Sequence, residues 1–552
     1  MAQTRIAPPP ARAEGQWALD EREPLNANER FKLEDDGLAV RARIEDVYSR
    51  DGFASIPADD LRGRMRWWGL YTQRRPGIDG GRTATLEPHE LDDEYFMLRV
   101  RSDGGALSAA QLRTIAQVSV EFGRGTADLT DRQNIQLHWV RIEDVPQIWQ
   151  RLEAVGLSTQ EACGDTPRVI LGSPVAGVAA DEIIDGTPAL EHIARRYIGD
   201  PAYSNLPRKF KTAISGSPHQ DVAHEINDVS FVGVVHPELG PGFDVWVGGG
   251  LSTNPRLAVR LGAFATLEQV PEVWKGVIGI FRDYGYRRLR TRARLKFLVA
   301  DWGPQVFRDV LEQEYLGFSL ADGPAPPPPP LGRRDHVGVH PQADGRFYVG
   351  AAPVVGRVSG PLLAQVAELV EAAGSDRVRL TVEQKLVVLD VPATNVDALA
   401  DGLEALGLAV RNASTFRRGT MACTGLEYCK LAIVETKARA RELVFQLEER
   451  LPTFDAPLTV NLNGCPNSCA RIQVADIGLK GALAGGEDGY QVHLGGGLGL
   501  TSGLGTTLRG LRVSAHDLPD YVERVARRFD EQRQDGELFA TWVHRAAEED
   551  LR

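Results

Sequence analysis

The sequence predicts an α+β fold in which one chain pattern occurs twice, and an internal repeat is the main reason. The segment that starts at Phe96 aligns with the segment that starts at Phe347, at a constant offset of 251 residues. The same offset joins Ser108 to Ser359 and LEAVGL to LEALGL. Each copy reads strand, helix, strand, helix, strand by its hydrophobic periodicity. Such a block is a compact unit of the split βαβ, or ferredoxin-like, type.

A second repeat predicts two larger α/β domains. At an offset of about 247 to 248 residues, VWVGGGLS aligns with VHLGGGLG. At this register Ser217 lies opposite Cys465, and Asp221 lies opposite Cys469. The first copy therefore lacks the second cysteine pair, so we expect one metal centre and not two.

The repeats divide the chain into six segments. We expect an N-terminal arm and wrapping segment at 1–90, half-domain 1 at 91–160, a larger domain at 161–322, a proline-rich linker at 323–340, half-domain 2 at 341–411 and a second larger domain at 412–552. The run GPAPPPPP from Gly323 to Pro330 has the composition of an extended polyproline spacer. A polyproline recognition motif is the alternative.

Composition limits the class of protein. The length of 552 residues suits several domains, and 43% hydrophobic residues supply large cores. The N-terminal stretch has no apolar signal region, and no run approaches the ~18 apolar residues of a membrane span. The cysteines have metal spacing and not disulfide pairing, which suggests a reducing compartment. We therefore expect a cytoplasmic monomer, and the net charge of −12 argues against nucleic-acid binding.

Four of the five cysteines form two close pairs, Cys423-x5-Cys429 and Cys465-x3-Cys469. An amphipathic stretch and a short apolar strand separate the pairs and can fold back to bring them to one point. Four converging thiolates are the ligand set of a [4Fe-4S] cluster or of a structural zinc site. The first spacing is looser than a usual zinc knuckle, and no histidine lies in the interval, which favours the cluster. Four buried cysteines without a metal are the remaining alternative.

The text TGLEYCKLAIVETK followed by NLNGCPNSCAR closely resembles the nitrite/sulfite reductase family, whose members contain sirohaem and a [4Fe-4S] cluster. The resemblance covers nearly the whole chain and implies that family's fold, a pseudo-two-fold duplication that holds the cofactors between its halves. It implies that Cys423, Cys429 and Cys465 bind the cluster. It also implies that Cys469 binds the cluster and bridges to the sirohaem iron.

The resemblance also implies four cations that bind a small oxyanion. They are Arg99 in FMLRVR, Arg168 in GDTPRVILGSP, and Lys209 and Lys211 in NLPRKFKTAISG. Fixed positive charges favour an oxyanion, stabilise developing negative charge and relay protons. The K-x-K pattern resembles sulfite-reducing members more than nitrite reductases. Val169 departs from the asparagine that commonly follows the TPR arginine, so hydrogen bonding there is open.

Sirohaem carries eight carboxylates, so further cations are needed around it. The candidates for this role lie in TDRQNIQLHW, in RTRARLKFLV and after the last cysteine: Arg132, Gln133, His138, Arg292, Arg294, Lys296 and Arg471. The alternating cations of RTRARLK suit a strand that presents charge to a polyanion. No glycine-rich nucleotide motif is present, so we expect neither flavin nor nicotinamide.

Cys163 lies outside the two cysteine pairs, five residues before Arg168. A lone cysteine is commonly an inert core residue. The sharper hypothesis is a side-chain crosslink between Cys163 and Tyr71, as in some ferredoxin-dependent members of the family that the chain resembles. The aromatic text WWGLY around Tyr71 is an edge of a cofactor pocket or a surface cluster.

Together these features predict a ferredoxin-dependent sulfite reductase that transfers six electrons to sulfite. Nitrite reduction to ammonia with the same cofactors is the alternative, and precorrin-3B synthase is disfavoured by the four cations. A zinc-stabilised scaffold without catalytic activity is the alternative from another class. Because the donor ferredoxin is acidic, a local basic patch must bind it, and the candidates for that patch are Arg417, Arg418, Lys430 and Lys437.

Overall fold

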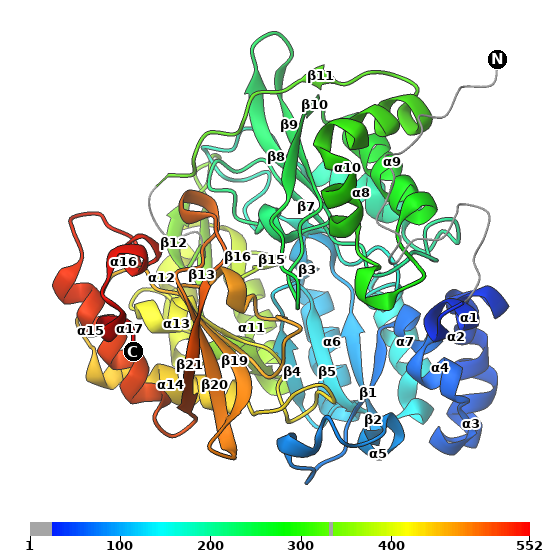
Figure 1. Ribbon diagram of the computed structural model, residues 1–552, viewed down its shortest axis with the longest axis horizontal. Helices are drawn as coiled ribbons and strands as arrows, with labels where there is room; N and C mark the ends of the chain where they lie inside the picture. The colour runs from blue at the N-terminus through cyan, green and yellow to red at the C-terminus, as the bar shows by residue number, and fades with distance from the viewer. Residues whose placement is uncertain (1–24, 331–334) are drawn as a thin grey trace.

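Four β-sheets organise the part of the chain that the computed structural model describes, residues 25–330 and 335–552 (Figure 1). Residues 1–24 of the expected N-terminal arm and wrapping segment lie outside the described residues. Short helices follow it and pack beside the first sheet: α1 (Ala27–Glu34), α2 (Val40–Arg43), α3 (Ser49–Asp51) and α4 (Ala58–Arg62). Asn26 caps α1 by accepting hydrogen bonds from the backbone of Asn28 and Glu29.

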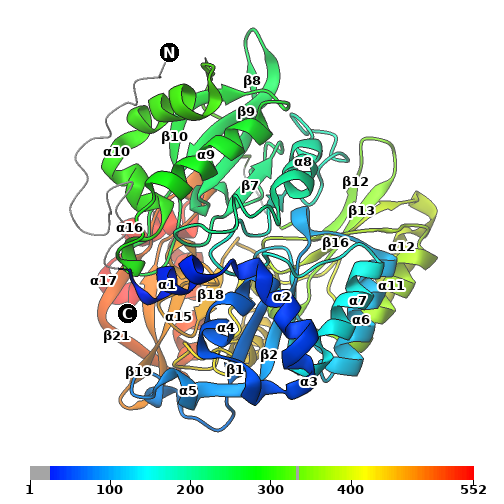
Figure 2. The same cartoon turned by 90° about the vertical axis from the view of Figure 1, so that its right-hand side faces the viewer.

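Two five-stranded sheets form the ferredoxin-like halves. In spatial order the first contains β1 (Leu70–Arg74), β2 (Asp92–Val100), β5 (Ile135–Val140), β4 (Thr126–Leu129) and β14 (Arg357–Ser359). The second contains β12 (Gly338–Pro341), β13 (Phe347–Ala351), β16 (Leu386–Val391), β15 (Arg377–Leu380) and β3 (Ala106–Ser108). The helices of the halves are α6 (Ala109–Phe122), α7 (Val145–Ala154), α11 (Gly360–Ala372) and α12 (Val396–Ala405), which lie together in Figure 2.

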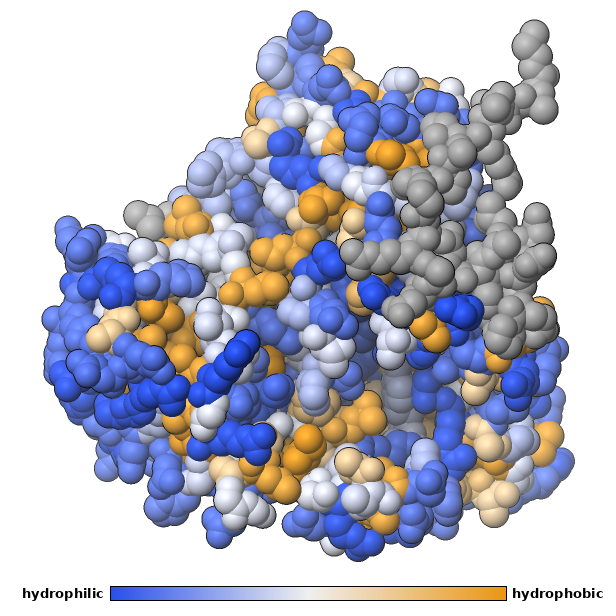
Figure 3. Space-filling model, viewed as in Figure 1, coloured by the Kyte–Doolittle hydropathy of each residue, from blue (hydrophilic) through white to orange (hydrophobic). Residues whose placement is uncertain are grey.

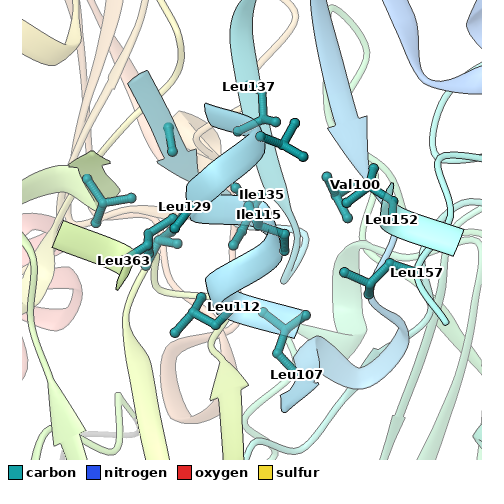
Figure 4. Close-up of a cluster of buried hydrophobic side chains, with 14 of the residues drawn as sticks. Val100, Leu107, Leu112, Ile115, Leu129, Ile135, Leu137, Leu152, Leu157 and Leu363 are labelled. Carbon is teal, nitrogen blue, oxygen red and sulfur yellow. The ribbon is translucent and has the colours of Figure 1, made fainter. Parts of the chain in front are cut away.

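Each half lends a strand to the other. Ala106 of β3 pairs with Arg379 of β15, and Arg357 of β14 pairs with Asp128 of β4. Ala106 and Arg357 are 251 positions apart, as are Asp128 and Arg379, so the exchange obeys the offset of the sequence repeat. The hydrophobic core is consequently shared by both halves. In Figure 4 Leu363 of α11 lies in the same cluster as Leu112 of α6.

The two larger domains have similar sheets, each with two parallel pairings followed by antiparallel ones, three in the first sheet and two in the second. The first contains β6 (Leu171–Gly172), β7 (Thr212–Ser215), β8 (Val229–His236), β9 (Gly240–Val247), β10 (Val259–Ala265) and an edge strand β11 (Ala321–Asp322). The second contains β17 (Thr420–Ala422), β18 (Val460–Asn463), β19 (Ile477–Ala484), β20 (Glu487–Leu494) and β21 (Thr506–Ser514).

Helices cover these two sheets. The first domain has α8 (Thr187–Tyr197), α9 (Val270–Tyr284) and α10 (Leu295–Val310), and the second has α13 (Thr415–Gly419), α14 (Lys437–Arg450), α15 (Leu518–Gln532), α16 (Phe539–Arg545) and α17 (Glu548–Leu551). The predicted strand through RTRARLK is wrong, because Arg290–Arg292 form a 3-10 turn and α10 begins at Leu295. The six segment boundaries stay a prediction.

Hydrophilic residues cover most of the face seen in Figure 3. No helix among the described residues combines the length and the apolar character that a bilayer crossing requires.

Candidate cofactor and oxyanion site

A cavity of about 700 Å³ lies where the first half-domain meets the loops of both larger domains. Its walls come from the segment around α4, from strands β1, β2 and β5, from residues 164–168 and 208–209, and from the loops that carry the four paired cysteines. The volume is in the range of cofactor pockets. Residues that are distant in sequence therefore share one enclosed space.

All four paired cysteines line this cavity. Cys423 directly follows β17, and Cys465 and Cys469 follow the neighbouring strand β18, so parallel pairing of the two strands brings both pairs to one sheet edge. The backbone N–H of Gly464 donates to Cys423 Sγ at 3.3 Å. Cys465 is buried, whereas Cys469 is exposed.

The thiols interact electrostatically with one another. Burial, and then the nearby Cys469 thiol, raises the pKa of Cys423 to about 12. Burial also raises the pKa of Cys465, again with Cys469 as the next cause. A bound metal reverses this effect because its positive charge stabilises the thiolates.

The four thiols are not arranged as a site for a single ion. Among the described residues, no group of three or more His, Cys, Asp or Glu side chains is placed to hold one metal ion. Four cysteines that line one cavity are the donor set of a [4Fe-4S] cluster. The zinc alternative therefore lacks support in the geometry.

Three of the four predicted oxyanion-binding cations line the same cavity, namely Arg99, Arg168 and Lys209. Arg99 Nη1 donates to Cys163 Sγ at 2.9 Å. The guanidinium of Arg168 is held by two carbonyl oxygens of its own loop, at 3.1 and 3.3 Å. Lys211 lies next to the cavity wall, and its backbone N–H donates to Asp228 at 2.9 Å.

The two lysines are poorly solvated and close to other cations. Burial, followed by the charges of Lys211, Arg294 and Arg168, holds the pKa of Lys209 well below its ordinary value. Burial, followed by Arg132 and Arg294, lowers the pKa of Lys211 to about 7. Since nearby positive charges lower these pKa values, an anion bound in the cavity would raise them and favour the protonated form of the two lysine amines.

Two of the predicted sirohaem-binding residues, Arg132 and His138, also line the cavity. Arg132 donates to Asn227 Oδ1 at 2.7 Å and to Val169 O at 2.6 Å. His138 Nε2 lies 3.1 Å from Asp128, and its ring stacks on Tyr428 at 3.8 Å between centroids. The buried Arg132 Nε and His138 Nδ1 have no hydrogen-bond partner in the described part of the chain. The Arg132 Nε–H remains able to donate to an anionic group, which fits sirohaem, whereas His138 donates from Nε2 to Asp128 and its neutral ring leaves Nδ1 as an acceptor.

The other five predicted sirohaem-binding residues do not line the cavity. Lys296 donates to three backbone carbonyls of residues 250–254, and Arg294 pairs with Asp228 at 3.1 Å. Arg471 bonds Asp131 at 3.2 Å, and Arg292 lies over the Phe297 ring at 5.0 Å. Gln133 has positive φ and donates to carbonyl oxygens of residues 172 and 380, one in each repeat, both at 2.8 Å. Their contact with sirohaem stays a prediction.

Several cavity residues were missed by the sequence reasoning: Arg62, Arg208, Arg290, Gln136 and Asn467. Gln136 Oε1 accepts from Arg99 in the amide orientation that satisfies both of its neighbours, and its amide then donates to Thr424 at 3.2 Å. Gln136 lies in the TDRQNIQLHW segment, two positions before His138. Alternate residues of a strand point to the same face, which is the signal in the sequence that places Gln136 beside His138.

Tyr71 lines the cavity, with Arg66 above its ring at 5.5 Å. Cys163 is buried behind Arg99 and does not line the cavity. The aromatic WWGLY segment is therefore a pocket edge at Tyr71, whereas Trp67 and Trp68 are buried in the core. The crosslink between Tyr71 and Cys163 stays a prediction.

The four cations suggested for a donor patch are each engaged within the chain. The partners are Arg417–Glu448, Arg418–Asp335, Lys430–Asp92 and Lys437–Val355 O. Lys437 is also buried. These side chains therefore present little uncompensated charge to a donor.

Comparisons with known proteins agree with this site. The family described as "Nitrite and sulphite reductase 4Fe-4S domain" matches residues 163–320 and 413–552. The one described as "Nitrite/Sulfite reductase ferredoxin-like half domain" matches residues 89–155 and 340–406. Together the matched segments cover most of the chain, and the two half-domain matches are again 251 residues apart.

Individual relatives are similar over the full length. "Sulfite reductase [ferredoxin] 2" of Mycolicibacterium paratuberculosis is 59% identical and covers 100% of both chains. The solved structure of Mycobacterium tuberculosis NirA protein is 58% identical with a TM-score of 0.94, over 98% of this chain and 100% of that one. An assimilatory ferredoxin-dependent nitrite reductase of Haloferax mediterranei is 37% identical over 93% of this chain and 91% of its own. The chain is thus a member of the nitrite and sulfite reductase family, enzymes that bind sirohaem and a [4Fe-4S] cluster.

Proposed function

We propose that this enzyme reduces sulfite to sulfide, in six one-electron steps, with ferredoxin as the electron donor. One observation carries the proposal: the four paired cysteines and the cations Arg99, Arg168 and Lys209 line a single cavity. An electron store and an oxyanion site must be adjacent for such a reaction. When bound, the cluster and sirohaem supply the electrons and the iron centre where the anion reacts.

Cys469 is the cysteine that we propose both cofactors share. It is exposed, while the other three are partly or fully buried. Its thiol is also close enough to Lys209 and Arg99 to favour their charged forms. Cys469 thus interacts both with Cys423 and with the oxyanion cations, which supports its proposed role as a shared ligand.

The cations of the chain bind and protonate the anion. Arg99 and Arg168 hold fixed positive charge, because a guanidinium stays protonated at any working pH. The pKa of Lys211 is lowered to about 7, so its amine can give up a proton near neutral pH, and burial lowers the pKa of Lys209 as well. Sulfite loses three oxygens as water, and each loss consumes protons, so an amine that titrates near neutral pH suits the demand. Gln136 keeps Arg99 oriented toward the cavity.

Sulfite is favoured over nitrite by the K-x-K pair and by the similarity. The relatives at 58–59% identity are named sulfite reductases, whereas the nitrite reductase relatives are at 36–37%. Nitrite reduction at the same site is the second candidate. We further propose that the enzyme is a cytoplasmic monomer.

The test is a visible spectrum with iron analysis of the purified protein, before and after sulfite, followed by turnover of both anions with reduced ferredoxin. Sirohaem bands that shift on sulfite addition, and faster turnover of sulfite than nitrite, are expected. Lys211→Met should weaken turnover and leave the iron content intact. A protein without iron refutes the proposal, and faster turnover of nitrite selects the second candidate.

A further inference from the structure

Arg74 fastens a segment of the first half-domain to the loop that carries Cys429. We call residues 75–91, which connect β1 to β2, the strap. The backbone N–H of Arg74 donates to Tyr428 O at 2.9 Å. Its Nη1 donates to Thr83 Oγ1 at 3.0 Å and to Ala432 O at 3.4 Å, and its Nη2 donates to two strap carbonyls, both at 3.1 Å.

The strap approaches the cysteine loop backbone to backbone. Thr83 Oγ1 donates to Ala432 O at 2.7 Å. A Cβ on Gly80 would be 1.7 Å from Ile433 O, so only glycine permits this approach. The contact therefore keeps Arg74 next to the cysteine loop and away from solvent.

The guanidinium of Arg74 is a buried charge with no carboxylate in ion-pair contact among the described residues. Its relative exposure is 2%. Its hydrogen bonds go to carbonyl and hydroxyl oxygens, and within residues 25–330 and 335–552 it has no ion pair. Burial lowers the pKa of Arg74, and the Cys429 thiol and then the more weakly acting Asp79 carboxylate oppose this effect. A guanidinium remains protonated in proteins, so a full positive charge stays beside the cluster ligands.

Two other cations of the loop that carries Cys429 are compensated. Lys430 follows Cys429 directly but contacts the Asp92 carboxylate. Lys437 lies 3.6 Å from Asp128. Arg74 therefore differs from these two lysines, because no described carboxylate forms an ion pair with its guanidinium.

We propose that Arg74 raises the reduction potential of the cluster that Cys423, Cys429, Cys465 and Cys469 bind. This inference rests on the cluster of the proposed function. One-electron reduction adds a negative charge to the cluster, and a buried positive charge stabilises the reduced form. Cluster potentials depend on net charge, hydrogen bonding and solvent exposure, and Coulomb effects are larger away from water. Arg74 thereby eases the entry of electrons from the donor.

The test is a redox titration of the holoenzyme, with the reduced cluster followed by electron paramagnetic resonance. Arg74→Gln removes the charge and keeps hydrogen-bond donors. We expect it to raise the oxidised-to-reduced ratio at a fixed potential about tenfold, which is about 59 mV for a one-electron couple. Arg74→Lys keeps the charge and is expected within about threefold of the wild type. Arg75→Gln removes the exposed neighbouring charge as the matched control and should change nothing, because water screens it.

Iron content is measured first in each variant, so the potential is compared only between loaded proteins. An unchanged potential in iron-loaded R74Q overturns the inference, and so does an equal shift in R75Q. A tenfold shift in R74K also overturns it, since charge would then not be the cause, and this arm holds even if R74Q loads no iron. Failure of the proposed function would appear separately, as absent sulfite turnover with wild-type potentials intact.

Discussion

Replacing Arg294 by methionine tests whether this residue supports the fold or binds the cofactor. Its guanidinium pairs with Asp228 at 3.1 Å, and the two side chains are 7% and 0% exposed. At that distance, with an effective dielectric constant of about 20, the attraction is about 5 kcal/mol. Removing one partner of a buried pair costs about 3–5 kcal/mol, because the other charge stays buried and unpaired. We expect Arg294→Met to lower the free energy of unfolding by that amount.

The assay is urea unfolding followed by tryptophan fluorescence, for R294M, D228N, the double variant and a control. The double variant should lose less than the sum of the single losses, because no unpaired charge remains. Arg292→Met is the control from the same cationic run. It removes a cation–π contact with Phe297, worth about 0.5–1 kcal/mol, from a side chain that is less buried than that of Arg294.

The opposite pattern would refute the structural role. If R294M unfolds at the wild-type urea concentration but purifies with little sirohaem, Arg294 binds the cofactor carboxylates, as the sequence pattern indicated. Sirohaem content is therefore measured on the same preparations.

Three further outcomes are expected. The affinity for sulfite should fall by about tenfold per pH unit above about pH 7, because the Lys211 amine is charged below its pKa of about 7 and neutral above it. Lys211→Met should remove this pH dependence, which separates the effect of the amine from protonation of sulfite itself. Equal pH dependence in the variant and the wild type would contradict the assignment. If Tyr71 and Cys163 are crosslinked, the intact mass is lower by about two hydrogens and Cys163 resists alkylation, whereas a full mass with alkylated Cys163 removes the crosslink. Gly80→Ala should speed proteolysis within the strap, because its Cβ would be 1.7 Å from Ile433 O, and an unchanged cleavage rate would show that the strap yields without opening.

The duplication and the metal centre could be predicted from sequence because a constant repeat offset and the spacing of the cysteine pairs are visible in the order of the residues. The offset of 251 residues reappears in the strand exchange between the halves, where Arg357 pairs with Asp128. The cysteine pairs each follow a strand, and parallel pairing of those strands brings them together. Hydrophobic periodicity and residue spacing are enough to reveal such features.

Which cations face the cavity was decided only by the tertiary structure. Arg294 and Lys296 lie in a run that looks like a polyanion-binding strand, yet the chain forms a helix there. Arg294 pairs with Asp228, and Lys296 donates to backbone carbonyls. Arg208 and Arg290 line the cavity, although within the motifs NLPRKFKTAISG and RTRARLKFLV other residues were the predicted ligands. A residue type fixes what a side chain can bind, but its partner comes from a segment far along the chain, as Asp228 does for Arg294. Burial makes this pairing necessary, because a charge that is removed from water must be paired with a group that the fold places beside it.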